Sequence, residues 1–595
     1  MSTAKSEEKQ TELNAWGPID QQIQSLNAKL FSGLSPVSLA LAQLDWALNL
    51  IQTPSKQFKL QQSAWNNFSR FIWESLTPPT DSKTEGHSSS KNDPRFSDPA
   101  WSNFPWNGMV KAQHLGEQWW KDATQVRGMR QHSVDQMHFY ADKWLDMVSP
   151  SNWLMTNPQA IQTAIHTQGK SLLKGTDQAV QDWLKAHAKQ SIAQTTPHMK
   201  PGDGLAMTPG EIVARSHLCE LIQYKPSTVK VHAEPVLMVP SCIMKYYILD
   251  LSATNSMVKW LVSQGHTVYM VSWRNPDDDD ALLTMDDYIE EGVLASIEHV
   301  FQAHQEKIHL MGYCLGGTFA AMAAAAIANK SLDLKPSNKT KTDTTNPLAS
   351  LTLLAAETDF TEPGEMGVLI DEAQVRMLED MMASQGFLSG QQMAGSFQFL
   401  HSRELVWSNR SKRWLMGEED TPNDLMTWNT DVTRLPAVMH SQYLRQCFLN
   451  NDLANGHFKF DGQTLLLRNI DVPCYAVGTV KDHVSPWRSV YKIHELVSGP
   501  VTFVLTNGGH NAGIISEPGH QGRHFQARTT LSNQPRLTAD DWLEHANENE
   551  GSWWTHWSSW LIEHGSKRHV TARQPIHSTQ WGSAPGQYVK VCYAD

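Results

Sequence analysis

The stretch that decides the fold is Lys307-Ile308-His309-Leu310-Met311-Gly312-Tyr313-Cys314-Leu315-Gly316-Gly317-Thr318-Phe319-Ala320. An apolar strand enters a Gly-x-Cys-x-Gly turn, and an Ala-rich helix leaves it. Glycines at both ends of the turn let strand and helix approach closely, so the turn lifts the Cys314 sulfur above the sheet. The N–H of Leu315 then lies at the start of the helix, where the helix dipole favours negative charge. The pattern predicts Cys314 as a nucleophile and Leu315 as an oxyanion donor.

The pentapeptide by itself leaves a second interpretation open. An isolated cysteine among small residues is more often an inert core residue than a nucleophile. The surroundings favour catalysis, because an apolar strand precedes Cys314, the apolar run Phe319–Ala328 follows it, and suitable partner residues come later in the chain.

Length and composition narrow the possible classes of protein. At 595 residues the chain is too long for one ordinary core, so two or more domains are expected. A net charge of −12 argues against a nucleic-acid partner. Six cysteines without a CxxC pair suggest neither a disulfide framework nor a zinc site, and favour a reducing compartment. The N-terminus lacks the apolar core of a signal peptide, and the longest apolar run is too short to span a bilayer.

Residues 1–205 are predicted to form a mainly helical domain. Apolar side chains recur at steps of three to five, which places them on one helix face: Val126, Met129, Val134, Met137, Tyr140, Trp144 and Met147. Core packing is the favoured explanation, and a face for a partner subunit or a lipid-like surface is the alternative. The polar stretch Pro78–Pro94 is predicted to be a loop, and Pro201–Gly204 marks the domain boundary.

Residues 206–595 are predicted to form an α/β domain. Short apolar runs alternate with helical sequence: Pro235–Val239, His266–Ser272, Ile308–Met311, Leu351–Ala355, Cys474–Gly478 and Val501–Leu505. Such runs indicate a mostly parallel sheet covered on both faces by helices. The polar stretch Lys335–Pro347 is expected to be a surface insertion. Residues 356–455 are rich in Met and Trp without a clear sheet strand, so they are predicted to form a helical cap over the active site.

Two strand ends carry residues that could serve Cys314. Asp482 follows one strand, and His510 follows the next, after two glycines. Active sites of open α/β sheets lie at the carboxyl ends of strands, and the order Cys314, Asp482, His510 is that of the α/β-hydrolase fold. The imidazole would take the thiol proton, and the carboxylate would hold one tautomer. His483 is an alternative base, but a neighbour of Asp482 in sequence faces another way.

Several segments together resemble a known family, the class I polyhydroxyalkanoate synthases, which are polymerases of bacterial storage polyester. The resemblance is strong over 206–595 and weak before it, through Asp93–Trp101. Besides the turn at Cys314, the matching segments are Lys245–Leu251, Ser272–Pro276, Thr284–Tyr288, Asp424–Asn429 and Pro585–Val589.

The resemblance implies a Cys314–His510–Asp482 triad that polymerises (R)-3-hydroxyacyl-CoA with release of CoA. It implies no cofactor, since CoA is the leaving group. It also implies a cytoplasmic homodimer at the surface of polyester granules, with granule proteins such as phasins as partners. Tyr313 and Leu315 are similar to short-chain members, so 3-hydroxybutyryl-CoA is the expected substrate. A polyester depolymerase or thioesterase of the same fold, and a non-enzymatic granule-coat protein, are the alternatives.

One loop departs from the family pattern. Where the family has Val-Pro-Pro-x-Ile-Asn-Lys, this chain has Val239-Pro240-Ser241-Cys242-Ile243-Met244-Lys245. The loop follows the strand that normally supplies the second oxyanion donor. Both changes keep the backbone N–H groups, so activity is expected to survive, with Ile243 as the expected second donor.

Overall fold

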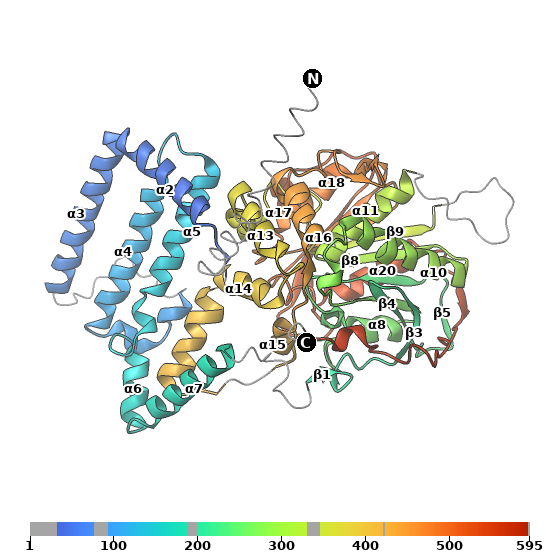
Figure 1. Ribbon diagram of the computed structural model, residues 1–595, viewed down its shortest axis with the longest axis horizontal. Helices are drawn as coiled ribbons and strands as arrows, with labels where there is room; N and C mark the ends of the chain where they lie inside the picture. The colour runs from blue at the N-terminus through green and yellow to red at the C-terminus, as the bar shows by residue number, and fades with distance from the viewer. Residues whose placement is uncertain are drawn as a thin grey trace, which may run out of the picture. The chain divides into compact units, whose positions relative to one another are not determined.

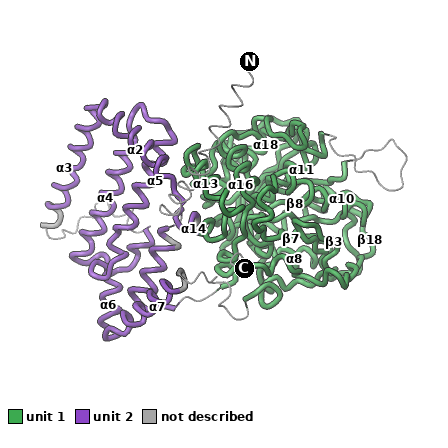
Figure 2. Tube along the Cα trace, viewed as in Figure 1, with its two compact units in different colours: residues 1–30, 191–394, 422–595 green, residues 31–190, 395–421 purple. Residues whose placement is uncertain are grey.

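The structure, a computed structural model, describes residues 33–76, 93–187, 199–329, 346–400, 402–419 and 423–592. The chain packs as two compact units, one of residues 1–30, 191–394 and 422–595, the other of residues 31–190 and 395–421 (Figure 2). Packing alone does not test the predicted domains, 1–205 and 206–595 with a cap at 356–455, so that division stays a prediction. The stretches expected to be a loop at 78–94 and an insertion at 335–347 lie mostly outside the described residues.

The first unit is built on a ten-stranded sheet in the order β17-β16-β15-β14-β9-β8-β6-β7-β4-β3 (Figure 1). The strands are β3 (Gly210–Arg215), β4 (Cys219–Tyr224), β6 (Val236–Val239), β7 (Val268–Trp273), β8 (Ile308–Tyr313), β9 (Leu348–Leu354), β14 (Cys474–Thr479), β15 (Val501–Thr506), β16 (His524–Thr530) and β17 (Asn547–Glu550). The strands from β15 to β7 pair in parallel, and both edges of the sheet are antiparallel. The predicted mostly parallel sheet is confirmed.

The six parallel strands are the six that the sequence predicts, and the antiparallel edge strands are the ones it misses. A parallel strand is covered on both faces, so it reads as a continuous apolar run. An edge strand such as β16 keeps polar residues on one face, and its burial alternates along the strand. β17 is exposed along nearly all its length and carries no apolar signal at all.

Helices surround the sheet, as Figure 1 shows for α8, α10, α11 and α20. Those of the first unit are α8 (Met257–Ser263), α9 (Met285–Asp287), α10 (Ala295–His304), α11 (Leu315–Ala328), α12 (Gly364–Leu369), α13 (Glu372–Ala383), α15 (Asp424–Thr430), α16 (Ala437–Gln442), α17 (Trp487–Tyr491), α18 (Ile493–Leu496), α19 (Ala539–His545) and α20 (Trp553–Glu563). Short strand pairs complete it: β1 (Lys200–Pro201) with β2 (Gly204–Leu205), β5 (Lys230–His232) with β18 (His569–Thr571), β10 (Phe387–Leu388) with β11 (Leu435–Pro436), and β12 (Lys459–Phe460) with β13 (Gln463–Thr464). The described part of 356–455 adds no strand to the main sheet, as expected.

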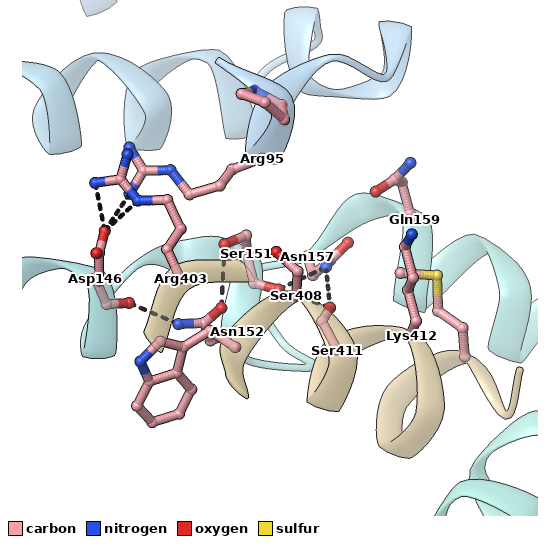
Figure 3. A pocket seen from close by; sticks show the side chains of 13 residues that line it. Arg95, Asp146, Ser151, Asn152, Asn157, Gln159, Arg403, Ser408, Ser411 and Lys412 are labelled. Carbon is pink, nitrogen blue, oxygen red and sulfur yellow. Dashed lines mark hydrogen bonds and ion pairs between the residues drawn. The ribbon is translucent and has the colours of Figure 1, made fainter. Parts of the chain in front are cut away.

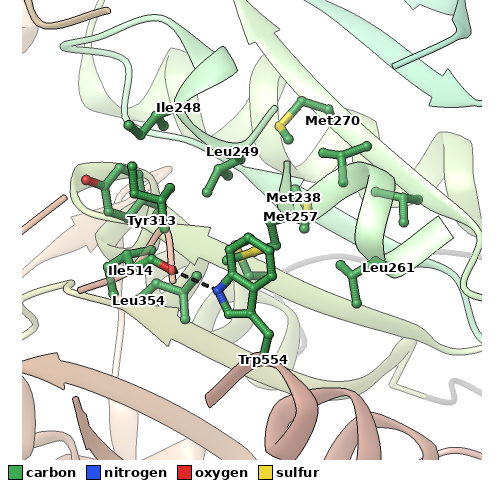
Figure 4. Close-up of a cluster of buried hydrophobic side chains, with 14 of the residues drawn as sticks. Met238, Ile248, Leu249, Met257, Leu261, Met270, Tyr313, Leu354, Ile514 and Trp554 are labelled. Carbon is green, nitrogen blue, oxygen red and sulfur yellow. Dashed lines mark hydrogen bonds between the residues drawn. The ribbon is translucent and has the colours of Figure 1, made fainter. Parts of the chain in front are cut away.

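Helix α20 accounts for part of the high tryptophan content. It buries four indoles, those of Trp553, Trp554, Trp557 and Trp560. Each indole N–H has an acceptor. Trp554 donates to the Ile514 carbonyl at 2.8 Å (Figure 4), and Trp557 donates to Thr352 Oγ1 at 3.0 Å. Large aromatic rings supply much buried apolar area, and their N–H groups need a partner when buried. These tryptophans are therefore core residues.

The second unit is helical. It contains α2 (Pro36–Ile51), α3 (Pro54–Leu76), α4 (Trp106–Thr124), α5 (Gln131–Met147), α6 (Pro158–His166), α7 (Lys170–His187), the end of α14 (Gly390–Leu400), and two shorter turns, η9 (Ser402–Ser408) and η10 (Ser411–Leu415). The expected continuous apolar face over 126–147 is wrong in its first part, because Gly128 has a φ of +97° and the helix begins only at Gln131. No helix in the described ranges combines the length and apolarity needed to cross a membrane.

A buried charge network joins the N-terminal helices to the later segment 402–416 within this unit (Figure 3). Asp146 accepts from Arg95 at 3.1 Å and from Arg403 at 2.7 Å, and Arg95 also pairs with Asp93 and Glu117. The side chains of Arg95 and Asp146 are 6% and 4% exposed. The network borders a polar pocket of about 80 Å³, large enough for ordered water. The two parts of the unit, about 250 residues apart in the chain, therefore share one set of buried charges.

We expect Asp146→Ala to destabilise the helical unit by about 1–3 kcal/mol, because it removes one of three carboxylates from the buried Arg95 guanidinium and the carboxylate that pairs with Arg403, whose side chain is 38% exposed. Differential scanning calorimetry should show the lowest unfolding transition moving down. Glu419→Ala is the control: it removes the partner of Lys174 in a pair whose side chains are 47% and 76% exposed, and it should have little effect. Equal shifts for both variants would show that the network does not stabilise the unit.

Candidate active site

The Cys314 turn has the geometry that its sequence predicts. Cys314 lies between β8 and α11 with φ 54° and ψ −130°, a backbone conformation that few non-glycine residues adopt. A Cβ on Gly312 would lie 2.4 Å from the Gly317 Cα, and a Cβ on Gly316 would lie 2.3 Å from the Pro240 carbonyl oxygen. Only glycine fits at either position. The strained turn leaves Cys314 partly exposed, whereas Cys219, Cys242, Cys447 and Cys474 are buried.

His510 and Asp482 form a hydrogen-bonded pair. His510 Nδ1 lies 2.8 Å from Asp482 Oδ2, and Asp482 Oδ1 accepts the backbone N–H groups of Val484 at 2.9 Å and Ser485 at 2.8 Å. Burial opposes the charge on Asp482, but the His510 charge and these hydrogen bonds outweigh it and lower the pKa of the carboxyl. The carboxylate is therefore ionised and oriented toward the imidazole.

The imidazole also lies near the cysteine, close enough for the charge of Cys314 to act on it. Burial acts to lower the pKa of His510, while the charges of Asp482 and Cys314 act more strongly and raise it well above its usual value. A cationic imidazole beside a cysteine is the arrangement that activates the sulfur as a nucleophile. The structure thus brings together Cys314, His510 and Asp482.

His483, the alternative base, lies elsewhere. Its side chain is 59% exposed, and its Nδ1 is 3.6 Å from Glu365 Oε1. The neighbour of Asp482 in sequence therefore does not share its site.

The two predicted oxyanion donors occupy different settings. Leu315 is the first residue of α11, so its N–H has no acceptor within the helix and lies at the positive end of the dipole. Ile243 belongs to the loop after β6, and its N–H donates to Ser241 Oγ at 3.3 Å. Ile243 would have to leave this bond to meet an oxyanion.

Glu357 is a carboxyl group near the site that the sequence did not single out. It follows β9, its backbone carbonyl accepts from Thr318 Oγ1 of α11 at 2.8 Å, and it is only 5% exposed. Its Oε1 is buried with no hydrogen-bond partner among the described residues. Burial, followed by the charges of Asp482 and Cys314, raises the pKa of Glu357 well above its usual value. The sequence offered one signal for Glu357: an acidic residue that closely follows a predicted strand, where active-site residues of this kind of sheet lie.

The surroundings of Glu357 explain the direction of its shift. The hydroxyl of Ser489 donates to the Asp359 carbonyl at 2.5 Å. Burial therefore dominates, and the pKa values of two carboxyl groups near Cys314 move in opposite directions, that of Asp482 down and that of Glu357 up.

The parallel sheet, the strained turn and the His–Asp pair define an enzyme of the α/β-hydrolase fold with cysteine in the nucleophile position. Residues 236–516 match the family described as alpha/beta hydrolase fold. Residues 92–261 match "Poly-beta-hydroxybutyrate polymerase (PhaC) N-terminus", and residues 15–56 match "Poly-beta-hydroxybutyrate polymerase N terminal".

Curated relatives agree with these matches. The chain is 33% identical over 508 residues to the poly(3-hydroxyalkanoate) polymerase subunit PhaC of Rhizobium meliloti, covering 84% of this chain and 80% of the relative. It is 34% identical over 547 residues to the protein of the same name from Cupriavidus necator, covering 90% and 89%. The chain belongs to the poly(3-hydroxyalkanoate) polymerase family, whose members are acyltransferases.

Among solved structures, a monoacylglycerol lipase of Paleococcus ferrophilus is similar at 12% identity and a TM-score of 0.31, covering 58% of this chain and 99% of the lipase. A likeness of that size has no bearing on function.

We expect Glu357→Gln to stabilise the protein increasingly as pH rises from about 4 to 8. In the unfolded chain the carboxyl ionises near pH 4.3, whereas the folded protein keeps it protonated, so wild-type stability falls with rising pH across this window. Glutamine has nearly the same shape and does not titrate. Melting temperatures of both proteins across the pH range test this; a difference that does not change with pH would contradict it.

Proposed function

We propose that the protein polymerises (R)-3-hydroxyacyl-CoA into polyhydroxyalkanoate through a covalent thioester on Cys314. Family membership supports polymerisation of hydroxyalkanoate into polyester. The observation that carries the finer proposal is Cys314 on the strained turn, beside an imidazole that is hydrogen-bonded to Asp482.

Acylation uses the three groups in turn. The Cys314 thiolate attacks the thioester carbonyl, and the N–H of Leu315 binds the oxyanion of the tetrahedral intermediate. One such donor is worth about 3 kcal/mol. The C–S bond to CoA then breaks, and protonated His510 returns a proton to the leaving CoA thiolate. One thioester replaces another, so the exchange is close to balanced and the acyl-enzyme remains reactive.

Chain growth uses the same groups with an alcohol as the nucleophile. His510 removes the proton from a 3-hydroxyl group, whose oxygen attacks the acyl carbon on Cys314. Asp482 stabilises the imidazolium that forms. A new ester bond forms as the C–S bond to Cys314 breaks, and the thiolate is regenerated. Water competes for the same acyl group, so exclusion of water by the proposed cap at 356–455 would decide between polymerisation and hydrolysis.

The finer features of the proposal come from the resemblance and from residue types. Tyr313 and Leu315, which flank Cys314, support a short-chain substrate such as 3-hydroxybutyryl-CoA. No cofactor is proposed, because CoA is the leaving group of the substrate. A homodimer at the surface of cytoplasmic polyester granules, with granule proteins such as phasins as partners, completes the proposal.

An intracellular polyester depolymerase or thioesterase is the second candidate, since the triad permits hydrolysis. The two differ in product when the protein is given 3-hydroxybutyryl-CoA. Release of CoA with growing polymer mass supports the polymerase; release of CoA with soluble hydroxy acid and no polymer would support the hydrolase.

We expect Cys314→Ala to abolish polymer formation and Cys314→Ser to leave at most a trace. A serine alkoxide is harder to form than a thiolate, and its oxygen ester transfers an acyl group less readily to another hydroxyl. CoA release and polymer mass, followed together, test this. Cys447→Ser, at a buried cysteine outside the proposed triad, is the control and should keep most activity. Substantial activity in Cys314→Ala would overturn the nucleophile assignment.

Two helices of the second unit support attachment to a granule surface. Exposed apolar side chains follow helical spacing on α2, at Val37, Leu41, Leu44, Leu48 and Ile51, and on α3, at Phe58, Trp65, Phe68 and Ile72. These residues are between 41% and 69% exposed, so core packing does not account for them. A stripe of this kind fits an apolar surface such as polyester. A growing chain tethered to Cys314 would anchor the enzyme as well.

We expect Leu41→Glu with Leu48→Glu, in the Cys314→Ala background, to lose most binding to preformed polyester granules. Two charges on the stripe oppose its transfer from water to an apolar surface. Co-sedimentation with the granules measures binding. The Cys314→Ala protein with Gln43→Glu and Lys59→Glu, which changes exposed polar positions of the same helices, should still bind. If the parent protein does not bind, tethering by product is sufficient and attachment through α2 is wrong.

A further inference from the structure

The loop after β6, Ser241–Tyr247, is held by the segment Trp428–Thr433, which lies within the proposed cap at 356–455. Four contacts join them at intervals along both segments. Trp428 Nε1 donates to the Lys245 carbonyl at 2.8 Å, the Tyr247 hydroxyl donates to Asp431 Oδ2 at 2.9 Å, Met244 and Val432 form a β-bridge, and Thr433 contacts two consecutive carbonyls. The loop and the start of the 3-10 helix Tyr246–Leu249 that follows it are thereby fixed by this segment.

Within this segment, Thr433 makes the contacts to Cys242 and Ile243. Its Oγ1 donates to the Cys242 carbonyl at 2.5 Å, and its N–H donates to the Ile243 carbonyl at 3.1 Å. Thr433 is 1% exposed, so water does not replace these bonds. One residue therefore fixes the peptide groups on both sides of Ile243.

Peptide planarity passes this constraint to the Ile243 N–H. The Cys242 carbonyl and the Ile243 N–H belong to one peptide group, and in a trans peptide they point in opposite directions. Holding the carbonyl from one side therefore sets the direction of the N–H on the other. That N–H now donates to Ser241 Oγ at 3.3 Å, beyond the usual range for such a bond.

The same loop borders the nucleophile. The carbonyl oxygens of Val239 and Pro240 lie 2.3 Å from where a Cβ on Gly316 would be, so the strand end touches the first turn of α11. The Pro240 carbonyl is itself fixed, since Trp273 Nε1 donates to it at 2.8 Å. Cys242 is near enough for the charge of Cys314 to act on its thiol. The loop that carries the Ile243 N–H therefore lies next to Cys314.

We propose that Thr433 is a positioning residue for the second oxyanion donor: its hydroxyl fixes the Cys242–Ile243 peptide, and Ser241 holds the Ile243 N–H until an oxyanion forms. This rests on the proposed thioester chemistry at Cys314. When the thioester oxygen becomes negative, a charge-assisted hydrogen bond replaces a long neutral one, which favours the transfer of the N–H from Ser241 to the oxyanion. No covalent bond changes in this step.

Thr433→Val tests the proposal, because valine keeps the shape and the N–H but removes the hydroxyl. We expect the rate of Cys314 acylation by 3-hydroxybutyryl-CoA, measured as single-turnover CoA release, to fall by about 10- to 100-fold, with little change in KM. Thr433→Ser restores the hydroxyl and should recover most of the rate. Ser241→Ala removes only the resting acceptor, so its acylation rate should equal or exceed that of the wild type.

Alkylation by iodoacetamide separates this effect from damage to the nucleophile. Alkylation needs the Cys314 thiolate but forms no oxyanion, so Thr433→Val should be alkylated at Cys314 at the wild-type rate, as located by mass spectrometry. Equal slowing of alkylation and acylation would show a general structural defect and overturn the positioning role. Acylation of Thr433→Val at the wild-type rate would overturn it too, as would a tenfold loss in Ser241→Ala.

The result for the wild type separates failure of the proposed thioester chemistry from failure of the proposed role of Thr433. If the wild type releases no CoA in a single turnover, the thioester chemistry itself fails. If the wild type is acylated and only the Thr433 and Ser241 variants depart from expectation, the chemistry stands and the positioning role fails.

Discussion

The close approach of β8, α11 and the end of β6 is the constraint on which the rest of the site depends. Three backbones meet around Gly312 and Gly316, at distances that no side chain would permit. That contact forces Cys314 into a positive φ and places its sulfur and the Leu315 N–H at the edge of the sheet. The strain is tolerated because the strand before it and the helix after it are almost completely buried.

Electrostatics then divides the roles of two carboxyl groups at neighbouring strand ends. Asp482 accepts two backbone N–H groups and the imidazole, so it is stable as an anion. Glu357 has no such donors and lies in a nearly closed environment, so it keeps its proton. A second anion beside Cys314 would oppose both a thiolate and an oxyanion. Keeping Glu357 neutral leaves Asp482 as the carboxylate that pairs with His510.

The helical unit shows how segments far apart in the chain come to depend on one another. Residues 402–416 lie within the stretch that the sequence predicts as a cap, yet they pack in the helical unit. Arg403 of this segment pairs with Asp146, which also pairs with Arg95. A segment further along, Trp428–Thr433, holds the loop Ser241–Tyr247 beside the Cys314 turn. One continuous stretch of chain therefore contributes contacts to the helical unit, through Arg403, and then to the unit that contains Cys314, through Trp428 and Thr433.

The parallel strands and the strained turn at Cys314 could be predicted from the sequence alone, and so could the proximity of Cys314, Asp482 and His510, whose catalytic roles stay a prediction. These follow from local rules: a continuous apolar run for a strand covered on both faces, glycines for a close approach, and chemistry placed at strand ends. The antiparallel edge strands, the neutral state of Glu357 and the grip of Thr433 on the Cys242 carbonyl were decided by the tertiary structure. Each depends on which groups the fold brings together. Thr433 and Cys242, for example, are 191 positions apart in sequence, and no local pattern records their contact.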